Sequence, residues 1–447
     1  MSNSSGRDRG LRERLVESGA GFRRGLADLP ANLNAFTIST GVIPAVVIFV
    51  TFAALQVNSL SRLGFSESQI IAWVAVSYAF GGLIGIVLSL YYKMPIAGAW
   101  AIPGFVLVAA TLETSSPAEA FGGFWLAGLF VLLLGVTGAI RKVVGLLPMP
   151  VMMGMVAGIL LQFPVGIVDS FQESAIIVGA GLVGYIVFDR LGGFFRRLPG
   201  ILGTAIFGVL AAIFTGQMGF SGVEFGFGQV AFTAPEFTLV SVLSIAIPLT
   251  VLVVGAENMQ ATGILASLKF KPPVNSMTIV SGLGGMLAAL FGAHNANVAG
   301  PTTAVMASQD AGPREGRYVA SVLAGAVYIL LALVAGTVVS LLGVVPAALT
   351  AVLLGMVLVQ PVINAIQQAW QANRFATGAF FAFFIAVSDV TFLGISAPFW
   401  SLVGGAIASG IFEFQDYREL IRGGSSQLTE DPEDEAAEVY EEKHSVK

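Results

Sequence analysis

Long apolar stretches alternate with short polar segments from residue 36 to residue 414. Apolar runs of about 20 residues are long enough to cross the hydrocarbon core of a bilayer as helices. The chain is therefore predicted to be an all-α membrane protein with 14 transmembrane segments, seven in each half. The predicted segments lie at about 36–57, 69–91, 96–111, 121–140, 149–168, 174–191 and 199–215, and then at about 239–267, 276–291, 294–309, 318–341, 346–369, 375–392 and 396–414.

The third and tenth segments are poor continuous helices. Residues 94–106 read Met-Pro-Ile-Ala-Gly-Ala-Trp-Ala-Ile-Pro-Gly-Phe-Val, and residues 292–306 read Gly-Ala-His-Asn-Ala-Asn-Val-Ala-Gly-Pro-Thr-Thr-Ala-Val-Met. Irregular backbone at membrane depth is stable only inside protein or along a cavity, and proline suits the first turn of a helix. Each segment is predicted to be a short strand followed by a half-helix that begins near Pro103 or Pro301. The alternative is a pair of proline kinks with asparagine caps.

The positions of the basic residues support this count. With the N-terminus in the cytoplasm, 21 of the 22 Lys and Arg residues lie inside, and only Arg62 falls outside. Membrane proteins concentrate Lys and Arg in their cytoplasmic loops, so both termini are predicted to be cytoplasmic, in the inner (plasma) membrane.

An odd number of segments in each half makes the two halves inverted. Five residue pairs share a separation of 198 residues, and Ile43-Pro44 parallels Ile247-Pro248 at a slightly different one. Interrupted segments at corresponding positions of two inverted repeats indicate the binding site of a transporter. The five pairs are Ala101 and Ala299, Pro103 and Pro301, Gly145 and Gly343, Pro148 and Pro346, and Gln162 and Gln360.

Composition narrows the class of protein further. Hydrophobic residues make up 55% of the chain and charged residues 11%, against about 25% charged in soluble proteins. The absence of cysteine excludes thiolate metal sites and cysteine catalysis, and no P-loop or metal-binding motif is visible, so no enzyme, cofactor or nucleic-acid partner is expected. Residues 1–35 are predicted to be a cytoplasmic segment, for which a simple lead-in is favoured over an amphipathic helix. Residues 423–447 are predicted to be a disordered acidic cytoplasmic tail.

The two half-helices would place their N-termini near the middle of the membrane, facing each other. Free N–H groups and the helix dipole favour an anion there, and no Lys or Arg is available at that depth. Glu257, inside the eighth segment, is the main candidate for carrying a proton, because an ionisable group in the membrane is functional by default. The alternative is a structural carboxyl bonded to a neighbouring helix. For Asp389, near the outer end of its segment, a wetted structural role is favoured.

Several other polar or aromatic residues are candidate ligands with structural alternatives. His294 either bonds the substrate or lies at the membrane interface, and Trp100 either stacks on an aromatic ligand or packs. Asn295, Asn297 and Thr302 either contact the ligand or satisfy backbone groups. The Gly-x-x-x-Gly spacings, such as 81–85 and 154–158, are predicted to be helix contacts. The predicted substrate-binding residues are Trp100, Ala101, Pro103, Gly104, Glu257, Gln260, His294, Asn295, Asn297, Gly300 and Thr302.

Five stretches resemble the benzoate:proton symporter family. They are Tyr-Tyr-Lys-Met-Pro-Ile-Ala-Gly-Ala-Trp-Ala-Ile-Pro-Gly (91–104), Leu-Pro-Met-Pro-Val-Met-Met-Gly-Met-Val-Ala-Gly-Ile-Leu-Leu (147–161), Lys-Pro-Pro-Val-Asn-Ser (271–276), Arg-Tyr-Val-Ala-Ser-Val-Leu-Ala-Gly (317–325) and Ser-Ala-Pro-Phe-Trp (396–400). The resemblance implies the fold shared with nucleobase/ascorbate and sulfate-type carriers, with a transporter domain over 36–415 and a homodimer. It implies a core domain (36–140 and 239–341) and a gate domain (142–215 and 346–414). The chain departs from the family at Ala256-Glu257-Asn258, where benzoate-type carriers tend to have Ser-Gln-Asn.

Three functions remain open at the level of sequence. The first is a proton-coupled symporter of a small aromatic carboxylate such as benzoate, with Glu257 as the proton carrier. The second is a nucleobase-type proton symporter, in which Glu257 hydrogen-bonds a neutral heterocycle. The third is an anion channel or exchanger without proton coupling.

Overall fold

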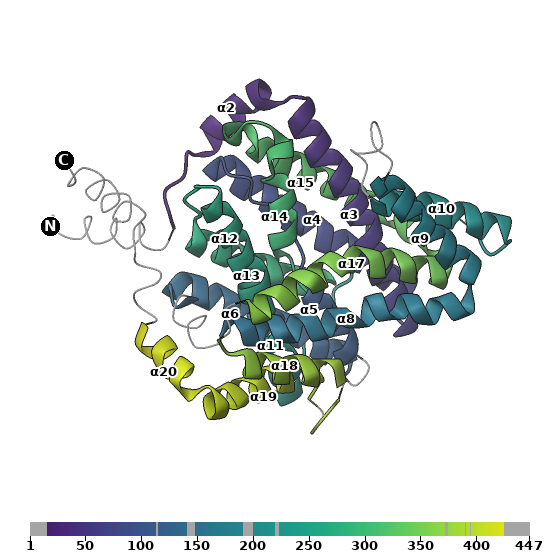
Figure 1. Ribbon diagram of the computed structural model, residues 1–447. Coiled ribbons are helices and arrows are strands. Elements are labelled where there is room, and N and C mark those ends of the chain that lie inside the picture. Colours follow the sequence, from purple (N-terminus) through teal and green to yellow (C-terminus); the bar gives the residue numbers. More distant parts are fainter. Residues whose placement is uncertain are drawn as a thin grey trace, which may run out of the picture.

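The computed structural model is a bundle of helices that surrounds two very short strands (Figure 1). It describes residues 16–112, 115–140, 148–190, 200–219, 223–371, 374–388, 390–393 and 395–423. Asp389, most of the predicted acidic tail and the first 15 residues lie outside this part of the chain. The helical membrane class is confirmed, since the described residues are predominantly helical and eight of their helices are long and apolar enough to cross a membrane. The count of 14 inverted segments stays a prediction.

The first half of the described chain contains eight helices and a strand. They are α2 (Phe22–Asn32), α3 (Ala35–Arg62), α4 (Glu67–Tyr92), β1 (Gly98–Ala99), α5 (Ile102–Leu112), α6 (Pro117–Thr137), α8 (Met149–Glu173), α9 (Ala175–Arg190) and α10 (Gly200–Phe214).

The second half begins after an irregular linker. Its elements are η2 (Ser241–Ala246), α11 (Ile247–Val251), η3 (Leu252–Asn258), α12 (Met259–Ser267), α13 (Val274–Phe291), β2 (Asn297–Val298), α14 (Gly300–Met306), η4 (Gln309–Ala311), η5 (Arg314–Gly316), α15 (Tyr318–Leu333), α16 (Ala335–Gly343), α17 (Ala347–Trp370), α18 (Ala376–Ser388), α19 (Ala397–Phe412) and α20 (Phe414–Gly423).

Two of the predicted spans are not single regular helices. The span predicted over 239–267 contains two π-helical stretches, η2 and η3, joined by α11. The span predicted over 318–341 is divided at Val334 into α15 and α16. A π-helical turn widens the backbone without changing its apolar pattern, so hydropathy does not reveal it, and such turns are frequent at functional sites.

Polar residues fix where several helices begin. Asn34 starts α3, and its side chain accepts hydrogen bonds from the backbone of Phe36 and Thr37. Ser66 and Ser116 start α4 and α6 in the same way, and each donates its own backbone N–H to the side chain of the third residue of the helix. Such caps satisfy N–H groups that have no partner inside the helix, and each contributes about 1 kcal/mol.

The helices pack in two groups. In one group, α6 packs against α13, and α15 packs against both α3 and α4. In the other group, α8 packs against α17 and α18, while α9 pairs with α10 and α18 with α19. The half-helix α5 and the η3 stretch both meet α8, so the interrupted segments lie where the two groups come together.

Glycines allow the closest contacts of this packing. The backbone of Gly154 touches Ala379 of α18, where a Cβ would clash with backbone atoms, and Gly158 meets Ala386 one turn further along. This confirms the predicted helix contact. Gly81 of α4 instead lies against Ala99 of β1, where a Cβ would come within 2.6 Å of the Ala99 Cα.

The N-terminal segment is more ordered than the sequence suggested. Residues 22–32 form the helix α2, which packs against α4, so the expectation of a simple lead-in is wrong for this stretch. The Glu17 carboxylate accepts hydrogen bonds from the backbone N–H groups of Asn275 (2.8 Å) and Ser276 (3.0 Å), in the first turn of α13. The partner of Glu17 lies more than 250 residues away, and local sequence cannot show this.

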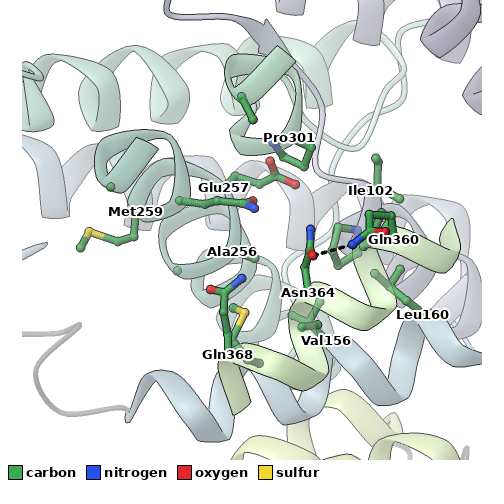
Figure 2. A pocket seen from close by; sticks show the side chains of 18 of the residues that line it. Ile102, Val156, Leu160, Ala256, Glu257, Met259, Pro301, Gln360, Asn364 and Gln368 are labelled. Atoms are coloured by element: carbon green, nitrogen blue, oxygen red, sulfur yellow. Dashed lines mark hydrogen bonds between the residues drawn. The ribbon is translucent and has the colours of Figure 1, made fainter. Parts of the chain in front are cut away.

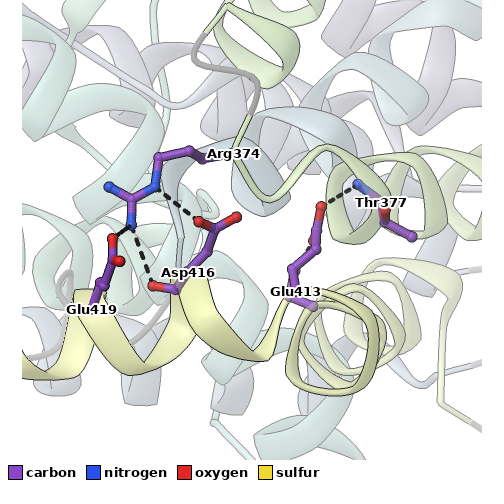
Figure 3. Close-up of polar contacts among 6 residues, drawn as sticks. Arg374, Thr377, Glu413, Asp416 and Glu419 are labelled. Atoms are coloured by element: carbon purple, nitrogen blue, oxygen red, sulfur yellow. Dashed lines mark hydrogen bonds and ion pairs between the residues drawn. The ribbon is translucent and has the colours of Figure 1, made fainter.

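The opposite end of the chain is attached to α18. Glu413 precedes α20, and its carboxylate accepts hydrogen bonds from the backbone N–H groups of Thr377 (2.7 Å) and Gly378 (3.0 Å) at the start of α18 (Figure 3). Arg374 bridges to Asp416 and Glu419 of α20 at 3.2 and 2.9 Å.

Candidate functional site

The two interrupted segments cross each other as a buried pair of antiparallel strands. Gly98 lies opposite Val298, and Ala99 lies opposite Asn297. Each strand leads directly into a short helix, β1 into α5 and β2 into α14. The pairing satisfies backbone groups that a helix would otherwise satisfy, which is a requirement for irregular chain at membrane depth.

Side chains of the second segment complete the hydrogen bonds of the first. The Thr303 hydroxyl accepts from the Ala97 N–H at 3.1 Å, and the Asn295 side-chain oxygen accepts from the Ala101 N–H at 3.3 Å. The Asn295 amide donates to the Asn297 side-chain oxygen at 3.0 Å. Both asparagines are buried, so the structure places them as partners of the backbone and of each other, the second of the two alternatives.

Glu257 lies at the centre of this arrangement. It belongs to η3 and is 2% exposed. The Gly300 N–H, in the first turn of α14, donates to its Oε2 at 2.9 Å. The backbone of Ile102, the first residue of α5, hydrogen-bonds the same carboxyl. The free N–H groups of both half-helices therefore converge on one side chain of the protein, near the position predicted for a substrate anion.

A cavity of about 600 Å³ opens in front of this carboxyl. Its walls come from the two half-helices, η3 and α12 on one side and from α8 and α17 on the other (Figure 2). Most of the lining is aliphatic or methionine, and neither Lys nor Arg is among the lining residues. An apolar cavity with a few convergent polar groups is typical of a small-molecule site. The polar side chains that line it are Glu257, Gln260, Gln360, Asn364 and Gln368.

The three amides of α17 were not among the predicted site residues. Gln360, Asn364 and Gln368 follow each other at intervals of four, so they lie along one face of the helix, toward the cavity (Figure 2). The Gln360 amide donates to the Asn364 side-chain oxygen at 2.9 Å. A row of amides with helical spacing inside an apolar span is a signal that the sequence does contain.

Only part of the predicted site borders the cavity. Pro103, Glu257 and Gln260 line it directly, and Gly300 contributes its backbone donor to Glu257. The side chains of Trp100 and Thr302 border a much smaller void of about 20 Å³ behind Glu257. The remaining predicted residues lie in the supporting structure, namely Ala101, Gly104, His294, Asn295 and Asn297.

His294 is part of a buried aromatic cluster. It is fully buried, its ring stacks on Trp73 with centroids 5.7 Å apart, and its Nδ1 accepts from the Trp73 Nε1–H at 3.2 Å. Trp100 and Phe105 meet the same imidazole edge-on. The interfacial alternative for His294 is therefore wrong. Trp100 is 3% exposed and packs among these rings, which agrees with its packing alternative.

Comparisons with known proteins bear on this site and fold. The model of the benzoate membrane transport protein family matches residues 31–411. The benzoate membrane transport protein of Acinetobacter baylyi is 28% identical over 344 residues, 77% of this chain and 86% of that protein. Inner membrane protein YdcO of Escherichia coli K12 is 24% identical over 372 residues, 83% of this chain and 94% of that protein.

Solved structures show a similar fold. The transmembrane domain of the cyanobacterial bicarbonate transporter BicA has a TM-score of 0.56 at 15% identity and covers 84% of this chain and 96% of its own. The structure of SLC26A9 has a TM-score of 0.54 at 14% identity, and the match covers 92% of this chain and 70% of the SLC26A9 chain. At such identities the likeness concerns the fold alone, whereas the family match extends over most of the sequence. The chain belongs to the benzoate membrane transport protein family.

Proposed function

We propose that this membrane transporter is a proton-coupled symporter of a small aromatic carboxylate such as benzoate. The observation that carries the proposal is the position of Glu257, whose carboxyl occupies the N–H donors of both half-helices at the edge of the cavity. The name of the Acinetobacter relative supports the choice of substrate.

The geometry suggests how proton and substrate are coupled. A substrate carboxylate that enters the cavity seeks the same N–H donors that Glu257 occupies, and no Lys or Arg lines the cavity. Two carboxylates a few ångströms apart repel strongly in a site of low dielectric constant. Substrate therefore binds when Glu257 is protonated and neutral, and each transported anion takes a proton with it.

The rest of the cavity suits an aromatic ring. Met153, Val156 and Leu160 of α8 form an apolar wall, and the amides of α17 face it from the other helix. Trp100 supports the site from behind through Phe52 and Tyr78, whose rings meet it edge-on. Asn295 and Asn297 hydrogen-bond the backbone of the interrupted segments, and His294 packs among the rings behind them. Thr302 borders the small void behind Glu257, and the small residues Ala101 and Gly104 allow close packing there.

We also propose a core and a gate domain, and the two packing groups support this division. The core comprises 36–140 and 239–341, and the gate comprises 142–215 and 346–414. Movement of the core past the gate would carry the cavity from one side of the membrane to the other. We further propose cytoplasmic termini and a homodimer.

A nucleobase-type symporter is the second candidate. Glu257 and Gln260 are spaced three residues apart and both line the cavity, so they offer hydrogen bonds to the edge of a neutral heterocycle. A competition experiment separates the two candidates. Excess benzoate should displace the substrate of an aromatic-carboxylate symporter, whereas excess uracil should displace the substrate of a nucleobase-type symporter. Uptake without movement of protons would instead indicate an uncoupled channel or exchanger.

Replacement of Glu257 tests the proposal. Glu257→Gln resembles the protonated residue in shape but cannot release a proton. The variant should exchange labelled benzoate across proteoliposome membranes and yet fail to accumulate it when a pH gradient is imposed. Glu257→Ala should also lose binding if the carboxyl touches the substrate.

The exposed Glu236 provides the control, since Glu236→Gln removes a carboxylate far from the cavity and should accumulate benzoate normally. Gradient-driven accumulation by a folded Glu257→Gln protein would exclude this residue as the proton carrier.

A further inference from the structure

A second cavity, of about 490 Å³, is lined by later turns of α5 and α8 than the cavity that Glu257 borders. The first turn of α5, at Ile102 and Pro103, borders the first cavity, and the following turns, at Val106 and Leu107, border the second. The same order holds along α8, where Met153 precedes and the exposed Gln162 follows. The two cavities therefore follow each other along one helix pair, and their linings meet on α8 at Ile159 and Leu160.

The second cavity contains an arginine where the first contains none. Arg62 is the last residue of α3, is exposed, and takes part in none of the ion pairs among the described residues. Ser59 of the same helix and Gln162 of α8 add two further polar side chains to the lining. Leu107 and Phe163 supply apolar walls beside them.

The positive charge of Arg62 lies among acidic residues. In the predicted topology, Arg62 is the only Lys or Arg of the sequence that lies in the outer segments connecting the spans. Acidic residues are common there, as at Glu67, Glu119 and Glu236. An anion that approaches this end meets a negative surface with one positive group, and that group lines a cavity leading toward the half-helices.

We propose that the second cavity is a vestibule that binds an aromatic carboxylate before it reaches the central site. Arg62 faces the carboxylate, Gln162 and Ser59 offer hydrogen bonds, and Phe163 and Leu107 contact the ring. The choice of ligand rests on the proposed function, and the assignment of this cavity to the outer side rests on the proposed orientation. The vestibule holds its ligand weakly, because Arg62 remains in contact with solvent.

Charged thiol reagents test the vestibule without relying on transport. The chain has no cysteine, so Ser59→Cys introduces one thiol into the cavity while keeping Arg62. In intact cells, each thiol is treated from outside with an anionic and with a cationic methanethiosulfonate. The ratio of the anionic to the cationic modification rate should be higher for Ser59→Cys than for Gln229→Cys in the exposed linker. Adding Arg62→Gln should lower the anionic-to-cationic rate ratio at Ser59→Cys about fourfold, because a neighbouring unit charge changes each rate about twofold in water and the effects multiply.

Salt and substrate sharpen the measurement. The ratio should approach that of the linker thiol near 1 M salt, where charges are screened beyond about 3 Å. Benzoate at millimolar concentration should slow modification of Ser59→Cys, and Arg62→Gln should remove that protection whereas Arg62→Lys retains it. A ratio that Arg62→Gln does not change, a lack of protection by benzoate, or modification only from the cytoplasmic side would each overturn the vestibule. Those results would leave benzoate transport by the unmodified protein untouched, so the two proposals fail separately.

Discussion

The two interrupted segments share a backbone form but differ in chemistry. β1 and α5 bring apolar and aromatic residues such as Trp100 and Phe105, whereas β2 and α14 are accompanied by Asn295, Asn297 and Thr303. Backbone hydrogen bonds pair the two strands, and the side chains that add hydrogen bonds to the backbone of the other segment, Asn295 and Thr303, both belong to the second segment.

The helices that precede these segments differ in the same way. At the separation that relates Ile43-Pro44 to Ile247-Pro248, Glu257 corresponds to Ala53 and Gln260 corresponds to Gln56. Ala53 and Gln56 are fully buried in the packing of α3, whereas Glu257 and Gln260 line the cavity. A single carboxyl thus hydrogen-bonds the first turns of both half-helices. Four pairs of substitutions test how far the two halves differ.

The largest effect is expected at the strand crossing. A Cβ on Gly98 would clash with the Gly81 carbonyl oxygen, whereas the residue 198 positions later is Ala296, which is buried with its methyl group accommodated. Gly98→Val should therefore destabilise the protein by about 3 kcal/mol or more, because backbone atoms of α4 cannot move aside. Ala296→Gly should cost only about 1 kcal/mol. Thermal unfolding in detergent would contradict this asymmetry if both variants lost stability equally.

Thr303 provides the second test. Thr303→Val keeps the shape of the side chain but leaves the buried Ala97 N–H without its acceptor, so a loss of about 1–3 kcal/mol is expected. Thr303→Ser retains the hydroxyl and serves as the control for the hydrogen bond. Equal melting temperatures for Thr303→Val and Thr303→Ser would show that the bond contributes little.

The corresponding glutamines provide the third test. Gln260→Ala removes a polar group from the cavity and should weaken benzoate binding about threefold to tenfold, as expected for one hydrogen bond of about 0.5–1.5 kcal/mol. Gln56→Ala should change thermal stability but leave the affinity of the folded protein as it was, because Gln56 is fully buried away from the cavity. Calorimetric titration of both variants measures the difference. A weaker affinity in Gln56→Ala alone would reverse the assignment.

The smallest effect is expected at the two prolines. Pro103→Ala and Pro301→Ala allow each half-helix to extend backward and cover its free N–H groups, which should weaken binding about twofold to fivefold, in line with a helix-terminus contribution of about 0.3–1 kcal/mol. Pro301→Ala should have the larger effect, because α14 provides the 2.9 Å bond to Glu257. Unchanged affinity in both variants would count against the half-helices as the anion site.

Strong local signals make much of the fold predictable from the amino-acid sequence. A carboxyl or a broken helix at membrane depth is costly, so Glu257 and the segments around Pro103 and Pro301 stand out from the apolar residues around them. The hydrogen-bond partner of a buried amide, by contrast, cannot be predicted from local sequence. Asn295 can satisfy a ligand or a backbone N–H equally well, and only the position of Ala101 in the folded chain decides between them.

The features that were missed depend on tertiary contacts. Gln360, Asn364 and Gln368 become part of the site because α17 turns that face toward Glu257 rather than toward lipid. The helix α2 is held by its packing against α4 and by the 2.6 Å ion pair between Asp28 and Lys93, the residue that follows α4.

The attachment of the chain ends has a practical consequence. Glu17 fastens the N-terminal segment to α13, in the group with α3 and α4, and Arg374 helps to fasten α20 to the start of α18, in the group with α8 and α17. A fluorophore near each attachment would therefore be carried by a different one of the proposed moving bodies. Energy transfer between the two dyes would then report the distance between the two bodies during transport. Both labels would lie away from the cavity and from lipid.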